Sequence, residues 1–138
     1  MRSLNEIASD LQTLLASGFQ TVRISVSQSP AQLLSEIRAI NPDSLPGVII
    51  AFDSLDYQGM SMTVVCRVKL ILIDQFRAGS DQRALSALQA GSALAALFPA
   101  DGTEINGVWY YPAGCAAVSP DPQYAALAFT LEVKQGSV

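Results

Sequence analysis

The 138-residue sequence contains no histidine, and its only lysines are Lys69 and Lys134. Histidine is the commonest general base, the usual partner of a serine or cysteine nucleophile, and the commonest zinc ligand. A glycine-rich phosphate loop of the P-loop or dinucleotide type is missing as well. The sequence therefore predicts a protein that is not an enzyme and binds no cofactor or metal, with both lysines on exposed strand faces.

Charge is also scarce, because only 14% of the residues are charged and the eight basic ones are outnumbered by twelve acidic ones. The basic residues are scattered singly, whereas gripping a phosphate backbone requires clustered Lys and Arg. No apolar run reaches the roughly 18 to 20 residues of a membrane span, and the first residues lack a secretory signal. We expect one folded domain over residues 1–138, cytosolic or particle-bound, with no membrane and no specific nucleic-acid binding.

The most informative stretch runs from Met60 to Asp74 and predicts one unusually long β-strand. Its even positions are apolar throughout, whereas its odd positions are mostly polar up to Lys69 and apolar at Ile71 and Ile73. Because successive side chains point to opposite faces, the 61–69 half should be wet on one side and the 70–73 half covered on both. Such a strand spans about 45 Å, which is more than one small core needs.

Three helices are predicted around this strand. Ser3 and Glu6 form a capping box for the first helix, which carries one apolar stripe and which Gly18 should end in a left-handed turn. The second helix starts with Ser29-Pro30 and stops at Asn41-Pro42, with Ile37 and Ile40 on its buried face. The third helix, 80–98, is rich in alanine and contains Gly91, which indicates close packing on the sheet.

Four further strands are predicted, at 20–27, 48–52, 104–111 and 124–133. In the first of them Val22 and Ile24 should face the core. Polar and turn-forming residues predict loops over 53–59 and 112–122, and a frayed tail over 135–138. The strand before the first of these loops and the long strand after it should form a hairpin.

The element order α-β-α-β-β-α-β-β predicts an α+β fold, with helices packed on a mixed, mainly antiparallel sheet whose long central strand belongs to a hairpin. Residues 20–111 also follow the order βαββαβ, so a ferredoxin-like fold is the competing architecture.

Several residues were weighed for chemistry. Asp53 and Asp56 could share a hard cation, but two carboxylates without a third are more often solubilising charges. Cys66 and Cys115 lack metal-ligand spacing; Cys66 lies on the apolar strand face, and a disulfide between the two stays open. The aromatic residues 109–111 could stack bases, but without neighbouring basic residues a sheet edge or a subunit contact is favoured.

The organisation of the chain resembles the tail terminator, or tail-completion, proteins of long-tailed bacteriophages, of the kind found in Mu-like phages and prophages. The resemblance rests on the capped helix at Ser3, the Pro46 to Phe52 strand, the long strand ending at Asp74, the alanine-rich helix from Ser80 and the final strand from Tyr124. It implies a structural virion protein that forms a ring, commonly a hexamer, at the head-proximal end of the tail. Such a ring ends tube polymerisation and joins the tail to the head connector, so its partners are its own copies, the tube protein and the connector protein. The localisation implied is the virion, with host cytoplasm during assembly.

A sheet that extends past its own core offers unpaired backbone groups to a neighbouring subunit. We therefore expect contacts with a neighbour or with the tube at the two ends of the long strand and on its wet half. An acidic ring would also repel the phosphates of DNA passing through it, with Asp53, Asp56 and Asp74 as candidate lining. The alternatives are another neck or connector component, and a ferredoxin-like domain that binds a small ligand. The predicted interface residues are Asp53, Asp56, Tyr57, Met60, Met62, Thr63, Arg67, Lys69, Asp74 and Arg77.

Overall fold

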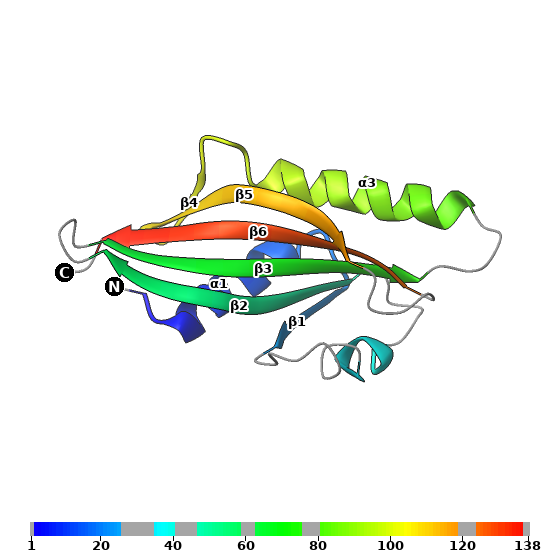
Figure 1. Cartoon of the computed structure of the whole chain (residues 1–138), viewed down its shortest axis with the longest axis horizontal. Coiled ribbons are helices and arrows are strands. Elements are labelled where there is room, and N and C mark those ends of the chain that lie inside the picture. Colours follow the sequence, from blue (N-terminus) through cyan, green and yellow to red (C-terminus); the bar gives the residue numbers. More distant parts are fainter. Residues whose placement is uncertain are drawn as a thin grey trace.

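Six strands form one sheet in the order β1-β2-β3-β6-β5-β4 (Figure 1). The structure is a computed structural model that describes residues 2–25, 35–40, 47–58, 63–75, 81–118 and 124–136, with the backbone alone at 53–58, 63–64, 75, 81–88, 117–118, 124–125 and 136. The strands are β1 (Thr21–Ser25), β2 (Gly47–Gln58), β3 (Thr63–Gln75), β4 (Thr103–Ile105), β5 (Val108–Val118) and β6 (Tyr124–Gly136), and the helices are α1 (Leu4–Leu15), α3 (Asp81–Leu97) and a short helical segment at 35–38.

The predicted α+β class with a mixed, mainly antiparallel sheet is confirmed. Only β1 and β2 are parallel, and every other neighbouring pair is antiparallel. The sheet order is not that of the ferredoxin-like fold, because β1 and β2 are direct neighbours, whereas a split βαβ unit places another strand between them. The sheet is strongly curved along its long strands (Figure 1).

The long strand is the centre of the sheet. β3 pairs with β2 from Thr63 to Ile73 and with β6 along its whole length, which confirms the predicted hairpin. Residues 60–62 of the predicted strand lie outside the described residues. The two-halves prediction holds, because Arg67 is exposed and Lys69 half-buried while Ile73 is fully buried. Val65 departs from it, since this valine lies in the wet half but is buried.

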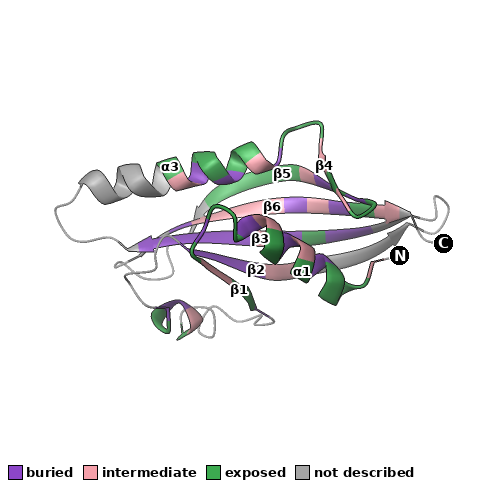
Figure 2. Ribbon diagram, turned by 180° about the vertical axis from the view of Figure 1, so that it is seen from behind, coloured by how far each residue is buried: buried purple, intermediate pink, exposed green. Residues whose placement is uncertain are grey.

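Two apolar clusters occupy opposite faces of the sheet. On the first face α1 and α3 cover β2, β3, β5 and β6, and Figure 2 shows α1 lying across the sheet from that side. On the second face Ile37 of the short helical segment and Ile40, which follows it, cover one end of the sheet, and both are buried as predicted. The second cluster also contains Ile49, Ile71, Ile73 and Ala126. The other end of the second face is not part of either cluster.

Helix α1 forms as its sequence predicts at the N-terminus. The Ser3 hydroxyl accepts the amide N–H of Glu6, and the Glu6 carboxylate accepts the amide N–H of Ser3, both at 3.2 Å. Ile7, Leu11 and Leu15 of the stripe are fully buried, whereas Leu4 is exposed. The prediction for Gly18 was wrong: the helix ends at Ala16 with right-handed geometry, and Gly18 does not adopt a positive φ.

Helix α3 lies as close to the sheet as its small residues predicted. A Cβ placed on Gly91 would lie 3.2 Å from Cδ1 of Leu127, and Leu72 and Phe129 also border this position. Leu94 and the following Phe98 are buried in the first cluster. Ser80, the predicted N-cap of this helix, lies outside the described residues.

Four predictions of strand boundaries were wrong, and in three of them the strand is longer than predicted. Residues 53–58 belong to β2 instead of a loop, and 113–118 extend β5 through the second predicted loop. The single strand expected at 104–111 is a hairpin, because Asn106 and Gly107 both have positive φ and connect β4 to β5 in a two-residue turn. The tail was expected to fray at 135, but Gln135 is paired with Val64 in β6.

The first predicted strand is described as β1 over Thr21–Ser25, at the sheet edge, and residues 26–27 of the prediction lie outside the described residues. Val22 is half-buried, as its apolar face requires, but Ile24 is 45% exposed instead of buried. β1 is the edge strand of the sheet and pairs with β2 on one side only, which leaves Ile24 accessible to solvent.

Candidate interaction surface

The uncovered end of the second sheet face carries a row of charged side chains from the two central strands. Arg67 and Glu132 are directly opposed in the β3–β6 register, and their Nη2 and Oε1 atoms are 3.6 Å apart. The Lys134 ammonium lies 3.8 Å from the other oxygen of Glu132. Because these groups are partly exposed, each ion pair contributes under about 1 kcal/mol to stability. These charged side chains therefore determine what the surface can bind, and they contribute little to the stability of the fold.

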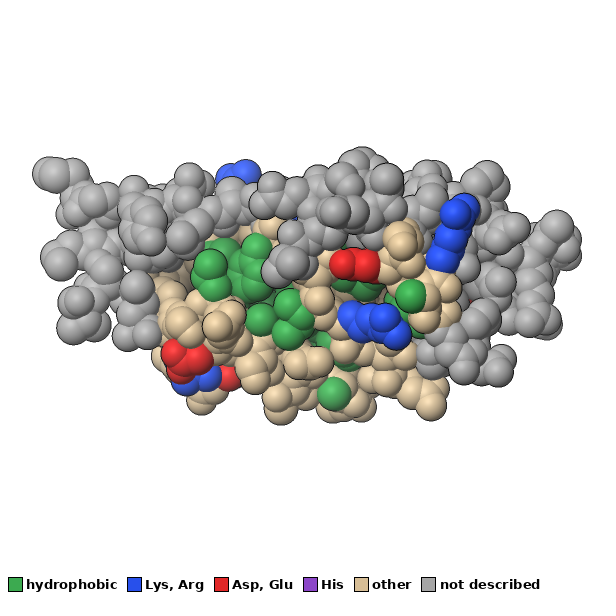
Figure 3. Space-filling view, turned by 90° about the horizontal axis from the view of Figure 1, so that it is seen from below, with side chains coloured by type: hydrophobic (Ala, Val, Ile, Leu, Met, Phe, Trp, Pro, Cys, Tyr) green, Lys and Arg blue, Asp and Glu red, His purple; other side chains and the backbone are tan. Residues whose placement is uncertain are grey.

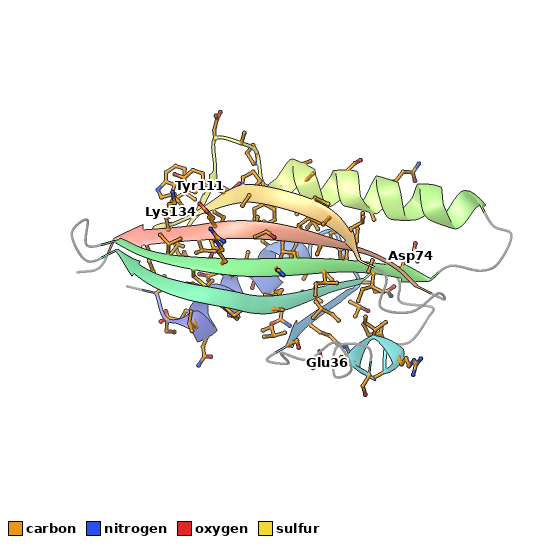
Figure 4. All side chains as sticks on the ribbon, in the orientation of Figure 1. Glu36, Asp74, Tyr111 and Lys134 are labelled. Carbon is orange, nitrogen blue, oxygen red and sulfur yellow. The ribbon has the colours of Figure 1, made fainter. Side chains whose placement is uncertain are left out.

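An aromatic pair continues this row onto β5. Trp109 and Tyr111 are two residues apart on one strand, so they share a face, and their rings stack at 6.2 Å with an interplanar angle of 20°. The Lys134 ammonium lies 5.5 Å from the centre of the Tyr111 ring, and Figure 4 shows the two residues side by side. Trp109 is 44% exposed, which is unusual for a residue of this size. We call Arg67, Lys69, Trp109, Tyr111, Glu132 and Lys134 the ladder surface.

The backbone that enters β4 supports the aromatic pair. Gly102 has φ of +92°, and a Cβ at this position would lie 2.7 Å from Cε1 of Tyr111 and 3.2 Å from Cε3 of Trp109. The Gly102 amide donates a hydrogen bond to the Pro99 carbonyl at 2.9 Å, which closes the turn that leads into β4. The rings of the ladder surface are therefore held from the side by a turn in which only glycine fits without strain.

The structure brings together only part of the predicted interface. Arg67 and Lys69 lie on the ladder surface, as predicted for the wet half of the long strand. Thr63 is at the same end of β3, and Asp53, Asp56 and Tyr57 are in β2, with side chains that are not described. Met60, Met62 and Arg77 lie outside the described residues.

Asp74 lies apart from the predicted interface residues Arg67 and Lys69. It lies at the far end of β3, away from the ladder surface, as Figure 4 shows, and only 4% of its surface is exposed. This burial within its own chain argues against the expected role of Asp74 in lining a conduit. The cause is its position at the end of β3 that is covered on both faces.

The predicted interface residues did not include Trp109, Tyr111, Glu132 and Lys134, although a sheet edge or a subunit contact was favoured for the aromatic residues 109–111. The alternation in the last strand correctly predicted that Glu132 and Lys134 point away from the first cluster. The signal that could have joined them to the aromatic pair is the i, i+2 spacing of Trp109 and Tyr111, with the buried Tyr110 between them.

A second polar cluster fixes the N-terminus to the end of the sheet. Arg2 donates two hydrogen bonds to the Asp10 carboxylate, at 3.1 and 2.6 Å, and its guanidinium also lies 2.8 Å from Glu6. Asn106 of the β4–β5 turn donates to the same carboxylate at 3.1 Å. The backbone of Arg2 and the Gln135 side-chain amide exchange two hydrogen bonds of 2.9 Å. The cluster is a structural clasp that joins α1, the turn and β6.

The titratable groups of the first cluster are held neutral. Burial raises the pKa of the Cys66 thiol to about 11. Burial and then the Asp10 carboxylate raise the pKa of Tyr110, whose hydroxyl is buried without a hydrogen-bond partner in the part of the chain that the structure describes. Cys66 is buried and Cys115 exposed, and both are free thiols.

Other kinds of site were sought among the described residues. No group of three or more Cys, Asp or Glu side chains there could hold a metal ion. Across residues 2–25, 35–40, 47–58, 63–75, 81–118 and 124–136, none of the helices combines the length and apolar character needed to cross a membrane. Seen from the β1 edge, the basic and acidic side chains drawn in Figure 3 lie in separate small groups. A scan against protein-family models finds no match for this chain, and a search of curated proteins finds no relative.

Proposed function

We propose that this chain is a structural subunit of a bacteriophage tail, a terminator that assembles as a ring on the head-proximal end of the tail tube. In this role the ring stops tube polymerisation and provides the surface to which the head connector binds. Neighbouring copies would occupy the edges of the sheet, and the ladder surface would contact the tube or the connector.

One observation carries the proposal: the long strands run past the short edge strands of the sheet. β1 pairs only with residues 47–51 of β2, and β4 pairs only with residues 108–110 of β5. The rest of each long strand therefore has an edge without a partner strand among the described residues. Natural monomers protect such edges, whereas in a closed ring each edge is occupied by a neighbour.

The ladder surface supports the same role. It combines an exposed tryptophan, a stacked tyrosine and fixed charges of both signs, and Trp, Tyr and Arg are the residues enriched in protein interfaces. The net charge of −4 also favours a ring through which DNA passes without being held. The ferredoxin-like alternative loses support, because the strand order is different.

The experiment measures the native mass of the purified chain, images it by negative stain, and adds it to polymerising tube protein. The expected result is a ring with a central opening that binds one end of each tube and shortens the mean tube length. Tubes that keep growing at both ends in excess chain would refute the terminator role. Binding to an isolated connector but never to a tube would favour a neck component instead.

A further inference from the structure

Two edge segments of the sheet, which have no partner strand within the described part of the chain, match each other. The β2 segment is 52–58, beyond the residues that pair with β1, and the β5 segment is 112–118, beyond those that pair with β4 and next to Tyr111. We call them the β2 edge and the β5 edge. They lie on opposite sides of the sheet and toward opposite ends of the strands, because Gly47 and Val118 belong to one end and Gln58 and Val108 to the other.

The β5 edge is open and chemically unprotected. Its described side chains, from Pro112 to Ala116, are all exposed, and a Cβ on Gly114 would meet no atom within 4 Å. The segment carries no charge. Pro112 and the bulge between Pro112 and Gly114 protect only its first residues, whereas the five residues that follow form a regular edge. Lysine or another charge is the usual protection of an edge in a monomer, and it is missing here.

The strand directions allow the two edges to pair between copies. β2, β3, β6 and β5 are successive antiparallel neighbours, so β2 and β5 are antiparallel to each other. In a cyclic assembly, where every copy has the same orientation about the axis, the β5 edge of one copy and the β2 edge of the next are therefore antiparallel as well. A joint antiparallel ladder can form without turning either strand.

The part of β2 that β1 covers and the part of β5 that β4 covers both lie outside the region where the two edges would pair. When the segments are centred on each other, position 55 is opposite Cys115. Position 55 is level with Cys66 of β3 and Cys115 is level with Leu70, so the neighbour is displaced along the strands by four residues of β3, or about 13 Å. β1 of the second copy then lies beyond position 118, and β4 of the first copy lies beyond position 58. A constant stagger between neighbours is what a closed sheet requires, because its strands must tilt against the axis.

From these edges we infer that copies of this chain join head to tail through the β5 edge of one copy and the β2 edge of the next, so that one sheet continues around the ring. The inference rests on the proposed function for closure into a ring, and it adds which strands join and in which register. The occupant of each edge is a second copy of this chain. Two copies related by a twofold axis could instead pair their β5 edges, which would give a closed dimer.

Disulfide trapping tests the register. By the strand register, position 55 is on the same sheet face as Cys66 and Cys115, and position 56 is on the opposite face. Leu55→Cys, combined with the native exposed Cys115, should give a ladder of dimers, trimers and higher species on a non-reducing gel after mild oxidation. Tyr57→Cys covers a register slipped by two residues, and Asp56→Cys is the control on the wrong face. The buried Cys66 should give no bands in the wild-type chain.

A charge test covers variants that fold poorly. Ala116→Lys places an exposed charge on the β5 edge, and Ala16→Lys makes the same change at an exposed position just after α1. Ala116→Lys should lower the native mass to that of a monomer with unchanged circular dichroism, whereas Ala16→Lys should keep the wild-type mass.

Three results would overturn the inference: a wild-type chain that is monomeric at about 100 μM, cross-linked species limited to Cys115–Cys115 dimers, or an assembly whose mass neither Ala116→Lys nor the cysteine pairs affect. The last result, together with normal tube capping, would leave the terminator role intact and reject only the proposal that copies join through the β2 and β5 edges. Rings cross-linked through the β2 and β5 edges that never stop a growing tube would support the edge pairing and reject the terminator role.

Discussion

Gly102 has φ of +92° and two aromatic rings within 3.2 Å of the position that a side chain would occupy, whereas Gly107 has φ of +83° and open space around it. A comparison of the two glycines therefore separates the cost of backbone strain from the cost of a steric clash. At Gly107 a methyl group adds backbone strain alone. At Gly102 it adds the same strain and a clash with Tyr111 and Trp109, which are already packed in the β-sheet.

We predict that Gly102→Ala lowers the free energy of unfolding by about 2 to 4 kcal/mol, because positive-φ strain costs about 1 kcal/mol and overpacking about 1 to 3 kcal/mol. Gly107→Ala is the matched control and should lose about 1 kcal/mol. Urea unfolding monitored by circular dichroism measures both. Equal losses in the two variants would show that the rings move aside at no cost.

The buried thiol of Cys66 predicts how stability depends on pH. Its pKa is about 11 in the folded chain against an ordinary value of 9.0, so above pH 9 the unfolded chain releases this proton more readily than the folded one. The stability contributed by the neutral thiol is complete below pH 9 and is lost as the pH rises toward 11. Tyr110, whose pKa is also raised, acts in the same direction above its ordinary value of 10.0, so it adds a smaller loss of stability between pH 10 and pH 11.

The free energy of unfolding should therefore fall by on the order of 2 kcal/mol between pH 8.5 and pH 11, since one pKa unit corresponds to about 1.4 kcal/mol. Cys66→Val removes the titrating thiol at nearly constant shape and should flatten most of this slope. Urea titrations at four pH values provide the measurement. A wild-type slope that persists in Cys66→Val would assign the loss to other groups.

At the level of elements, the close contact between Gly91 and the sheet positions helix α3. Gly91 faces Leu127, Leu72 and Phe129, so the helix axis can lie nearer to β3 and β6 than a larger residue would permit. The exposed Ala95 lies on the same helix without this contact. The small size of Gly91 thus sets how closely α3 can approach the sheet.

Gly91→Val should lower the free energy of unfolding by about 1 to 3 kcal/mol, because overpacking outweighs the gain of about 0.5 kcal/mol from replacing a helical glycine. Ala95→Val tests the helix propensity alone and should cost about 0.6 kcal/mol or less. Thermal and urea unfolding compare the two. A Gly91→Val chain as stable as the wild type would mean that α3 can shift outward freely.

The elements also show which features sequence patterns determine. Alternation and capping predicted α1, the β2–β3 hairpin and the change of burial along β3, because those signals are local. The ends of β2 and β5 were missed because Asp53 to Gln58 and Pro112 to Gly114 have turn-like composition, and only pairing with β3 and β6 makes these segments extended. The Asn106-Gly107 turn did have a local signal, which the apolar residues around it concealed.

The candidate surface was predictable to a similar degree. Arg67 and Lys69 followed from the alternation of one strand, and so did the outward direction of Glu132 and Lys134. Their meeting depends on the register between β3 and β6, whose residues are far apart in the sequence. No local pattern contains that register, because it results from the packing of the whole sheet.

At the level of the whole molecule, the edges and the ladder surface are separate. The β2 and β5 edges are the ones proposed to join neighbours, whereas Trp109 pairs with Glu104 and Lys134 within its own sheet. Trp109 is the only tryptophan of the chain and is 44% exposed, so its fluorescence reports on the ladder surface alone. Ring formation and tube binding should therefore affect this signal differently.

We predict that ring assembly leaves the quenching of Trp109 by acrylamide unchanged, and that adding tail tubes reduces it by about half or more, because a docked tube excludes the quencher from an interface tryptophan. Lys134→Glu, which reverses a charge of the ladder surface, should weaken capping without changing the native mass of the ring. Trp109→Phe is the control for the origin of the signal and should remove the emission while preserving the fold. Protection of Trp109 on ring formation, before any tube is present, would show that neighbouring copies cover the ladder surface, and the face that meets the tube would then have to be another one.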